Sequence, residues 1–405
     1  MERLSAHELL HVLAYLDARS LAAAQCACAL LCRAAAAATL WERHRPADAA
    51  YRRPSPRDAV LAERRATRNR DRGRWAKRVI KTPGDSDRPL VSLRGARLAV
   101  ASRGDRAVCA FDLGDGSPSP QHIDLDPYKV KAVGVHEDGR VLACSAHYWL
   151  MTKRDRRLFV WDGRKSGHSA LRSIDKEISD ADDPIAHDTA LWVGDLAVTV
   201  HRTAGNAVHV CAWGEALCQY ELQTTPFARG PVPAFALGEQ SLGVLDRHHL
   251  HVLDLRTSER YRYPMSYPDD AFLDWIHAAS YGTVAIAAVC GWESWPHGRL
   301  APRHHRRLLL WDMRAGTWAD GMRNHRTYGT LDDASDELLG LGPGLTLRTW
   351  SARERAVRHW DACTGALLRS YDAPIGDAVL AANDAYIVAS DGPGRLNVLD
   401  MTAAV

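Results

Sequence analysis

The chain has 405 residues, a quarter of them charged, and its 52 basic and 49 acidic side chains leave a net charge of only +3. A balance so near zero excludes a global field of the kind that draws a protein to nucleic acid or to membranes. The nine cysteines are scattered and odd in number, which argues against a disulfide framework and favours a reducing compartment. At this length we expect two or three domains, or a small module and one large domain.

The most apolar stretch, residues 20–41, is rich in alanine and carries Gln25 and Arg33. A charged side chain at that depth argues against a membrane span, and no basic leader precedes an uninterrupted apolar core. We therefore expect a cytoplasmic or nuclear protein. Alanine and arginine richness leaves the source open, and if the protein is viral the compartment is that of the host cell.

The first 41 residues predict short helices with an apolar face. Ser5 and Glu8 can form a capping box at the first helix start, and Asp17 and Ser20 mark a second start. Leucines recur at helical spacing after the first start, at positions 9, 10, 13 and 16. So small a unit hides little surface, and its apolar face needs a partner protein or the rest of the chain.

The segment LSAHELLHVLAYLDARSL, residues 4–21, resembles the start of an F-box, which runs Leu-Pro, two residues, Leu-Leu, and then a second leucine group before Leu-Asp. The second half also stands at the spacing of the family's Cys, Trp, Leu, Leu and Trp, with Cys28, Leu31, Ala34, Leu40 and Trp41. Ser5 replaces the family's proline, and Leu31 replaces its first tryptophan. The alternative is an ordinary N-terminal helical hairpin packed on its own domain.

Residues 42–75 form a basic connector. Ser55, Pro56 and Asp58 predict a helix start with a Ser-x-x-Asp cap, and Gly73 predicts the end of that helix. Such an arginine-rich helix is either a surface for nucleic acid or an acidic partner, or a solvated linker that holds two modules apart. Because acidic residues are interleaved among the arginines, we favour the linker.

From about residue 76 short β-like runs, separated by Gly, Asp and Pro turns, replace the helical periodicity. One sequence motif recurs. It consists of a few apolar or β-branched residues that usually end in an aromatic residue or leucine and then aspartate. Its seven copies end 39 to 58 residues apart, at Asp112, Asp162, Trp213, Asp254, Asp312, Asp361 and Asp400. This spacing brackets the repeat of about 40–45 residues expected for a four-stranded propeller blade with insertions.

The repeats resemble a degenerate WD40 propeller. Trp-Asp pairs survive at 161–162, 311–312 and 360–361, whereas the family's Gly-His pair is largely missing. Aspartate after a strand also has a plain explanation, because its side chain can accept hydrogen bonds from turn amides.

The last repeat lacks an outer strand, and an unpaired strand edge is a liability. Residues 76–81 (AKRVIK) are an orphan strand before the first repeat, and we predict that they complete the last blade and close the ring. The sequence thus predicts a small all-α F-box module over residues 1–45, a basic helical linker over 46–75, and an all-β seven-bladed propeller over 76–405.

No constellation of residues predicts catalysis, a cofactor or a metal. Three cysteines of the helical segment and His44 match no common zinc spacing, and cysteine there packs as a small apolar residue; these cysteines are Cys26, Cys28 and Cys32. No phosphate-cradling Gly-rich loop or nucleophile elbow is present, and the mostly apolar inner strands argue against a metal-dependent hydrolase in the channel. We also interpret the strand histidines as surface and core residues rather than metal ligands; these are His248, His249 and His251. The same interpretation applies to His304 and His305.

Two insertions between the second and third strands of repeats two and five, residues 147–157 and 291–307, combine aromatic side chains with arginine and lysine. Such side chains are typical of protein-recognition hot spots. The arginine guanidinium can also form bidentate hydrogen bonds with a carboxylate or phosphate group. We predict a surface for an acidic or phosphorylated protein segment, with Tyr148, Trp149, Arg154, Arg156, Trp292, Trp295, Arg299 and Arg303 as substrate-binding residues. The alternative is that the tryptophans fold back onto their own blades.

F-box proteins with a propeller are substrate receptors of Skp1–cullin–F-box (SCF) ubiquitin ligases. The resemblance implies that the N-terminal apolar face docks a Skp1-like adaptor, and through it the cullin complex, with Leu4, Leu9, Leu10, Leu13, Leu16, Leu21 and Trp41 in contact. Such a receptor performs no bond chemistry and works by proximity, and we expect neither nucleic acid nor a membrane as a partner. The alternative is an interaction scaffold that is not linked to ubiquitination.

Overall fold

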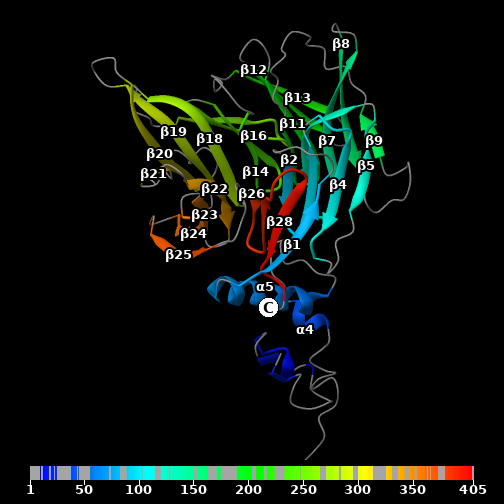
Figure 1. Cartoon of the computed structure of the whole chain (residues 1–405), viewed down its shortest axis with the longest axis vertical. Helices are drawn as coiled ribbons and strands as arrows, with labels where there is room; N and C mark the ends of the chain where they lie inside the picture. The colour runs from blue at the N-terminus through cyan, green and yellow to red at the C-terminus, as the bar shows by residue number, and fades with distance from the viewer. Residues whose placement is uncertain are drawn as a thin grey trace, which may run out of the picture.

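The computed structural model places a ring of β-sheets above a small group of helices (Figure 1). The residues that it describes are 10, 12–17, 20–21, 23–24, 38–42, 44, 55–72, 74–82, 89–102, 104–114, 120–126, 128–149, 153–162, 171–174, 189–202, 207–213, 217–223, 232–246, 248–264, 271–281, 284–294, 300–312, 325–330, 336–342, 346–351, 354–362, 364, 366–372 and 379–403. Two helices are described in full, α4 (Ala38–Glu42) and α5 (Pro56–Arg72).

The strands form seven four-stranded antiparallel sheets. The first three sheets in chain order are β2 (Pro89–Arg94), β3 (Arg97–Ser102), β4 (Ala107–Asp112) and β5 (Gln121–Asp124); β6 (Lys129–Val135), β7 (Val141–Trp149), β8 (Lys153–Trp161) and β9 (Leu171–Ile174); and β10 (Thr189–Val193), β11 (Leu196–Arg202), β12 (Ala207–Trp213) and β13 (Leu217–Gln223). We call these blades one, two and three.

Blades four, five and six follow the same order. They are β14 (Ala234–Leu237), β15 (Ser241–Leu245), β16 (His249–Asp254) and β17 (Arg260–Pro264); β18 (Ala271–Tyr281), β19 (Val284–Ser294), β20 (Leu300–Asp312) and β21 (His325–Thr330); and β22 (Asp336–Gly342), β23 (Thr346–Ser351), β24 (Ala356–Asp361) and β25 (Leu367–Asp372). Blade seven consists of β26 (Val379–Ala382), β27 (Tyr386–Ser390), β28 (Arg395–Asp400) and β1 (Ala76–Lys81).

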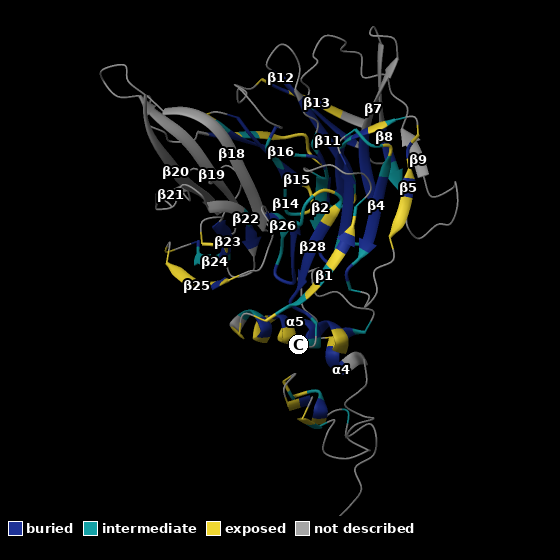
Figure 2. Ribbon diagram, in the orientation of Figure 1, coloured by how far each residue is buried: buried dark blue, intermediate teal, exposed yellow. Residues whose placement is uncertain are grey.

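The first strand of each blade contacts the first strand of the next blade, and β26 contacts β2, so the sheets close into a ring. The fold is a β-propeller. In blade one the outer strand is the most exposed, as Figure 2 shows: β3 is buried at all but one of its residues, whereas only one residue of β5 is buried. The buried second and third strands therefore read as nearly continuous apolar runs, as expected of strands covered on both faces.

The recurring aspartates stabilise the turn after the third strand of a blade. Asp112 Oδ1 accepts a hydrogen bond from the Gly114 amide at 2.9 Å. Asp254 Oδ1 accepts two, from Arg256 and Thr257, both at 2.9 Å. The Thr402 amide donates to Asp400 in the same way. The turn-capping explanation of the repeated aspartate is confirmed at these positions.

The closing strand is also where the sequence places it. β1 pairs antiparallel with β28 over all six of its residues, from Ala76 opposite Asp400 to Lys81 opposite Arg395. The guanidinium of Arg78 on β1 forms an ion pair with the buried carboxylate of Asp400. Segments more than 300 residues apart in the chain are thus joined in one sheet, so opening this pair would open the ring.

Helix α5 begins and ends where the sequence predicts. The Ser55 hydroxyl accepts a hydrogen bond from the Asp58 amide at 3.4 Å, and the helix begins at Pro56, which has no amide to satisfy. One face of the helix is buried, with Ala59, Val60, Ala62, Ala66 and Asn69.

This buried face overturns the solvated linker that we favoured from the sequence. Val60 belongs to a cluster with N-terminal leucines, whereas Ala66 belongs to the core cluster that contains blade seven. The small and apolar residues recur at helical spacing, which makes a continuous face despite the many arginines. The helix therefore joins the N-terminal segment to the propeller instead of holding the two apart.

Buried polar contacts hold α5 on the propeller. The Asn69 side-chain amide donates to the backbone carbonyls of Met401 at 2.8 Å and Ala403 at 2.9 Å. Next to it, Arg70 donates to the Asp384 carbonyl at 3.1 Å and lies 3.2 Å from its carboxylate. The same carboxylate accepts a hydrogen bond from the buried Arg348 of blade six at 2.7 Å. One carboxylate thus connects α5, the first turn of blade seven and blade six.

We predict that Asn69→Ala lowers the free energy of unfolding by about 1–3 kcal/mol, because it leaves the buried carbonyl of Met401 and the half-buried carbonyl of Ala403 without their donor. Chemical denaturation of the full chain measures this change. Arg68→Ala is the control, since Arg68 is exposed on the same helix turn. Equal stability of the two variants would contradict the role of Asn69.

A buried histidine in blade six makes the fold sensitive to acid. His359 Nε2 lies 3.1 Å from the Tyr371 hydroxyl. Burial, reinforced by the charges of Arg348 and Arg70, lowers the pKa of His359 to about 3 from its usual 6.5. Burial likewise raises the pKa of Tyr371 to about 12. Both groups are therefore neutral at neutral pH.

The unfolded chain takes up a proton on His359 below about pH 6.5, whereas the folded chain does so only near pH 3. Stability from this residue is therefore complete above pH 6.5 and is lost toward pH 3, by up to about 1.4 kcal/mol per pH unit. We predict that His359→Gln flattens the fall in unfolding free energy between pH 6 and pH 4, measured by denaturation at several pH values. Parallel curves for wild type and variant would contradict this assignment.

Candidate partner-binding surfaces

The two aromatic and basic insertions are hairpins rather than irregular loops. In blade two, β7 and β8 pair from Val141 opposite Trp161 out to Trp149 opposite Lys153. In blade five, β19 and β20 pair out to Ser294 opposite Leu300. Pairing satisfies the backbone groups of the inserted residues, which explains why the insertions extend existing strands. Figure 1 shows both hairpins at the end of the propeller opposite the helices.

The hairpin backbones place the predicted substrate-binding residues in register. Tyr148 lies opposite Arg154, and Arg156 lies two residues further along β8. Trp149 ends β7 opposite Lys153, and Trp292 lies opposite His304. Arg303 lies on β20. Trp295 and Arg299 lie outside the described residues, as do the side chains of the other six, so their role stays a prediction.

The turn between β15 and β16 of blade four lies at the same end as the long hairpins, since each of these turns joins the second and third strands. Asp246, only 2% exposed, follows β15. Its Oδ1 accepts hydrogen bonds from the amides of His248 and His249, both at 2.7 Å, and its Oδ2 lies 2.9 Å from His251 Nε2. His248 is exposed, His249 half-buried and His251 buried, so at least one of the three histidines faces solvent, as predicted.

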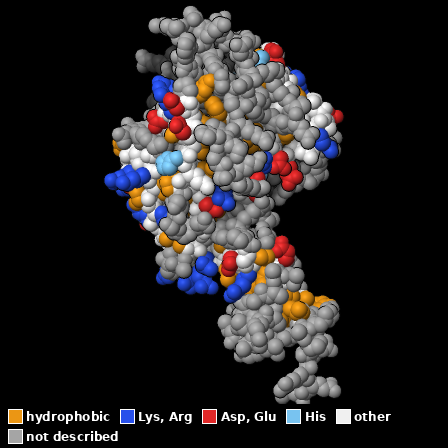
Figure 3. All heavy atoms as spheres, turned by 90° about the vertical axis from the view of Figure 1, so that its right-hand side faces the viewer, with side chains coloured by type: hydrophobic (Ala, Val, Ile, Leu, Met, Phe, Trp, Pro, Cys, Tyr) orange, Lys and Arg blue, Asp and Glu red, His pale blue; other side chains and the backbone are white. Residues whose placement is uncertain are grey.

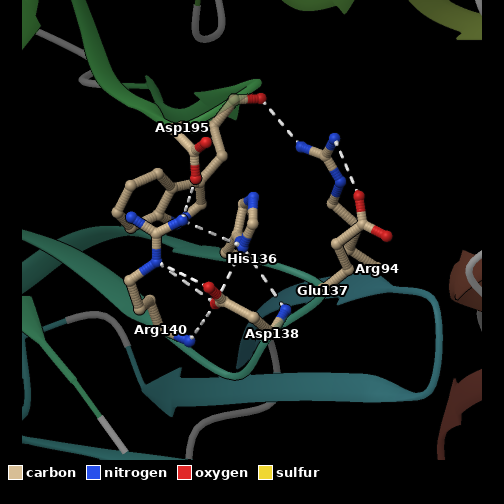
Figure 4. A network of polar contacts seen from close by, with 7 residues as sticks. Arg94, His136, Glu137, Asp138, Arg140 and Asp195 are labelled. Carbon is tan, nitrogen blue, oxygen red and sulfur yellow. Dashed lines mark hydrogen bonds and ion pairs between the residues drawn. The ribbon is translucent and has the colours of Figure 1, made fainter. Parts of the chain in front are cut away.

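At the helix end of the propeller, a polar network joins the first turns of blades two and three (Figure 4). Arg140 is paired with Asp138 at 2.9 Å and with Asp195 of the next blade, and its guanidinium lies 4.7 Å from the Trp192 ring centroid. Arg94 of blade one donates to the Trp192 carbonyl at 3.0 Å. These contacts link three neighbouring blades.

The Asp138 carboxylate is held ionised in this network. Burial would raise its pKa, but the Arg140 amide, the His136 ring and the Arg140 charge together lower the pKa below its ordinary value. Close approach of turns also restricts this rim, because a Cβ on Gly194, whose φ is +53°, would lie 2.4 Å from the Glu239 carbonyl oxygen. We therefore assign this rim a structural role.

We predict that Arg140→Ala lowers the free energy of unfolding by about 1–3 kcal/mol, because it leaves a partly buried carboxylate without its cation. Arg106→Ala is the matched control, since its pair with Asp126 has both side chains 57% exposed and we expect a change below about 1 kcal/mol. Thermal and chemical denaturation measure both. A larger effect at Arg106 would contradict the assignment.

The described part of the N-terminal segment is a small helical cluster. Asp17 Oδ1 accepts a hydrogen bond from the Ser20 amide at 2.7 Å, which caps the second helix as predicted. The buried side chains are Leu13, Leu21, Leu40, Trp41 and, from α5, Val60. His44 Nε2 lies 3.2 Å from the Leu16 carbonyl oxygen. The cluster thus has a core of its own that is completed by α5.

This cluster divides the predicted adaptor-binding residues. Leu13, Leu21 and Trp41 are buried inside it, at 3%, 0% and 0% exposure, so they pack within the chain. Leu10 and Leu16 are half-buried, while Leu4 and Leu9 lie outside the described residues. The exposed apolar side chains are ones the sequence analysis did not select, Val12 at 53% and Tyr15 at 78%. Their helical spacing from the leucines is the signal that could have identified them.

The surface near α5 is strongly basic. Five arginines of the helix are exposed, Arg57, Arg64, Arg65, Arg68 and Arg72. Figure 3 shows lysine and arginine side chains gathered below the propeller, and hydrophobic side chains on the surface of the N-terminal part. This end of the molecule therefore presents both charge and apolar area.

The cysteines whose side chains are described are Cys109, Cys144 and Cys211, which are buried and are not part of a disulfide. Burial raises the pKa of Cys109. Cys26, Cys28 and Cys32 lie outside the described residues, as do the side chains of His304 and His305.

Among the helices of the described part, none is long and apolar enough to cross a membrane.

Comparison with known proteins finds no matching family model and no matching curated protein. Solved structures that resemble the chain include the β-propeller domain of Myceliophteria thermophila Cps50 (Swd1), with 12% identity, a TM-score of 0.48, and coverage of 80% of this chain and 99% of that one. The WD40 domain of SCAP from fission yeast shows 11% identity and a TM-score of 0.48 over 81% and 98% of the two chains.

Virginiamycin B lyase from Staphylococcus aureus, an enzyme, shows 8% identity and a TM-score of 0.49, over 80% of this chain and 99% of that one. Likenesses at these identities and scores carry no functional argument. The assignment as a β-propeller therefore rests on the sheet topology and the contacts between blades.

Proposed function

We propose that the chain is the substrate-recognition subunit of an SCF-type ubiquitin ligase. In this role the N-terminal helical cluster binds a Skp1-like adaptor, and through it a cullin, while the propeller holds a protein substrate. The observation that carries the proposal is the packing of α5 against both the N-terminal cluster and the propeller. A rigid connection of this kind raises the effective concentration of a bound substrate near whatever the cluster recruits.

The buried and exposed residues of the cluster have different roles in this proposal. Leu13, Leu21 and Trp41 maintain its core, and the exposed Val12 and Tyr15 offer apolar area to the adaptor. Isolated exposed apolar residues are common on proteins. These two lie three residues apart, and the Tyr15 amide donates a hydrogen bond to the Val12 carbonyl at 3.2 Å, so one turn separates them and they share a face. We therefore move the centre of the proposed contact from the buried leucines to this pair.

The substrate would bind at the opposite end, on the hairpins of blades two and five. Both hairpins carry aromatic and basic residues in their sequences, including Tyr148, Trp149, Arg154 and Trp292. An acidic or phosphorylated segment fits this composition. The chain itself would supply binding and orientation and no bond chemistry, in the cytoplasm or nucleus where such ligases work.

We predict that Val12→Asp with Tyr15→Asp abolishes copurification of a Skp1-like adaptor and cullin with the full-length chain, because charge replaces the exposed apolar pair. Val79→Asp is the matched control, since Val79 is 56% exposed on the outer strand β1, away from the cluster. Circular dichroism and thermal unfolding verify that the propeller of each variant remains folded.

Three outcomes separate the candidate functions. Capture of adaptor and cullin by wild type and by Val79→Asp, but not by the double variant, supports the ligase role. Capture of an adaptor without a cullin favours a scaffold that is not linked to ubiquitination. If the wild-type chain captures neither, the ligase proposal fails and a propeller scaffold with a helical attachment remains.

A further inference from the structure

A histidine and carboxylate cluster lies at the turn between β15 and β16, at the end of the propeller that carries the long hairpins, and what we infer from it does not depend on the proposed function. Asp246, His249 and His251 each offer one possible ligand atom, and these three atoms lie within 4.8 Å of one another. The Asp246 carboxylate lies 3.4 Å from His249 Nδ1 through Oδ1 and 2.9 Å from His251 Nε2 through Oδ2. In a tetrahedral zinc site, bonds of about 2.0–2.1 Å place ligand atoms about 3.3 Å apart.

Two features hold the cluster in this arrangement before any ion binds. Asp246 is fixed by the two turn amides that donate to its Oδ1. His249 and His251 lie two residues apart on β16, so their side chains leave the same face of the strand. All three residues belong to one six-residue segment of a paired hairpin, so they need no distant part of the fold to meet.

We propose that Asp246, His249 and His251 bind a divalent first-row transition-metal ion. Two imidazoles and one carboxylate are a common ligand set for such ions, and three protein ligands leave a further position for water or for a group brought by a partner. His249 is half-buried, so the site opens toward solvent at the end of the propeller that carries the long hairpins.

The composition of the cluster suits a cation. Metal ions bind to deprotonated side chains, and the buried carboxylate of Asp246 lies beside both imidazole rings.

Arg262 opposes the ion and makes the proposal testable in two directions. The Arg262 Nη2 atom lies 3.2 Å from His249 Nδ1. When no ion is bound, His249 Nδ1 therefore accepts a hydrogen bond from the guanidinium. Arg262 is exposed, and it can turn into solvent when an ion takes its place. Removing the guanidinium should therefore strengthen metal binding, whereas a purely structural hydrogen-bond cluster predicts no such gain.

The test is calorimetric titration of the full chain with Zn²⁺ after dialysis against a chelator. We expect His249→Gln to weaken one site by more than about tenfold, since even the loss of a group that orients a ligand costs about 10- to 100-fold. We expect Arg262→Gln to tighten the same site. His209→Gln is the matched control, because His209 is a half-exposed strand histidine beside one carboxylate, 3.9 Å from Glu221.

Circular dichroism and thermal unfolding without metal establish that each variant is folded. Loss in His249→Gln, gain in Arg262→Gln and no change in His209→Gln support the site. Absence of Zn²⁺ binding by the wild type, or equal affinity of wild type and His249→Gln, would overturn it. Binding at other histidines or cysteines would appear equally in all variants and so would not be mistaken for this site.

Discussion

The structure depends on the pairing of β1 with β28. A propeller made from consecutive strands leaves its last sheet one strand short, and the exposed edge would be open to other chains. Here a strand from before the first blade fills that edge over six residue pairs, and the buried Asp400 binds Arg78 across the joint. The pairing completes a closed ring of seven sheets in which each sheet contacts its two neighbours.

Closure also determines where the N-terminal helices lie. β1 follows α5 directly, so the strand that closes the ring brings the helix to the end of blade seven. Asn69 then reaches the backbone after β28, and Arg70 reaches Asp384 in the first turn of that blade. The basic helix is thereby attached to the part of the ring that joins its two ends, and any force on the N-terminal cluster acts on that joint.

The two ends of the propeller differ in construction. At the helix end, short turns are tied together by Arg140, Asp138 and Asp195, and α5 covers part of the rim. At the opposite end, the strands of blades two and five extend beyond their neighbours, and the Asp246 turn presents histidines. A rigid, attached end and an end with projecting hairpins suit a protein that connects two partners.

The sequence by itself determined the strands, the closing strand and the boundaries of α5, because these follow from local periodicity and turn chemistry. The recurring motif, which ends in aspartate in every blade except blade three, marks each third strand, and residues 76–81 were recognisable as an unpaired strand. Two hairpins were predicted only as insertions, since pairing within an insertion depends on register between its two arms.

Only the tertiary structure decided which of these residues face inward. Leu13 and Trp41 could serve a partner or a core equally well by pattern, and burial against Val60 resolved this for the free chain. The arginine content of α5 concealed its packed face, since burial of a few small residues leaves little trace in composition. The meeting of Asp246 with His249 and His251 likewise needed the turn geometry, because alternation places side chains on faces but does not bring a preceding carboxylate back onto them.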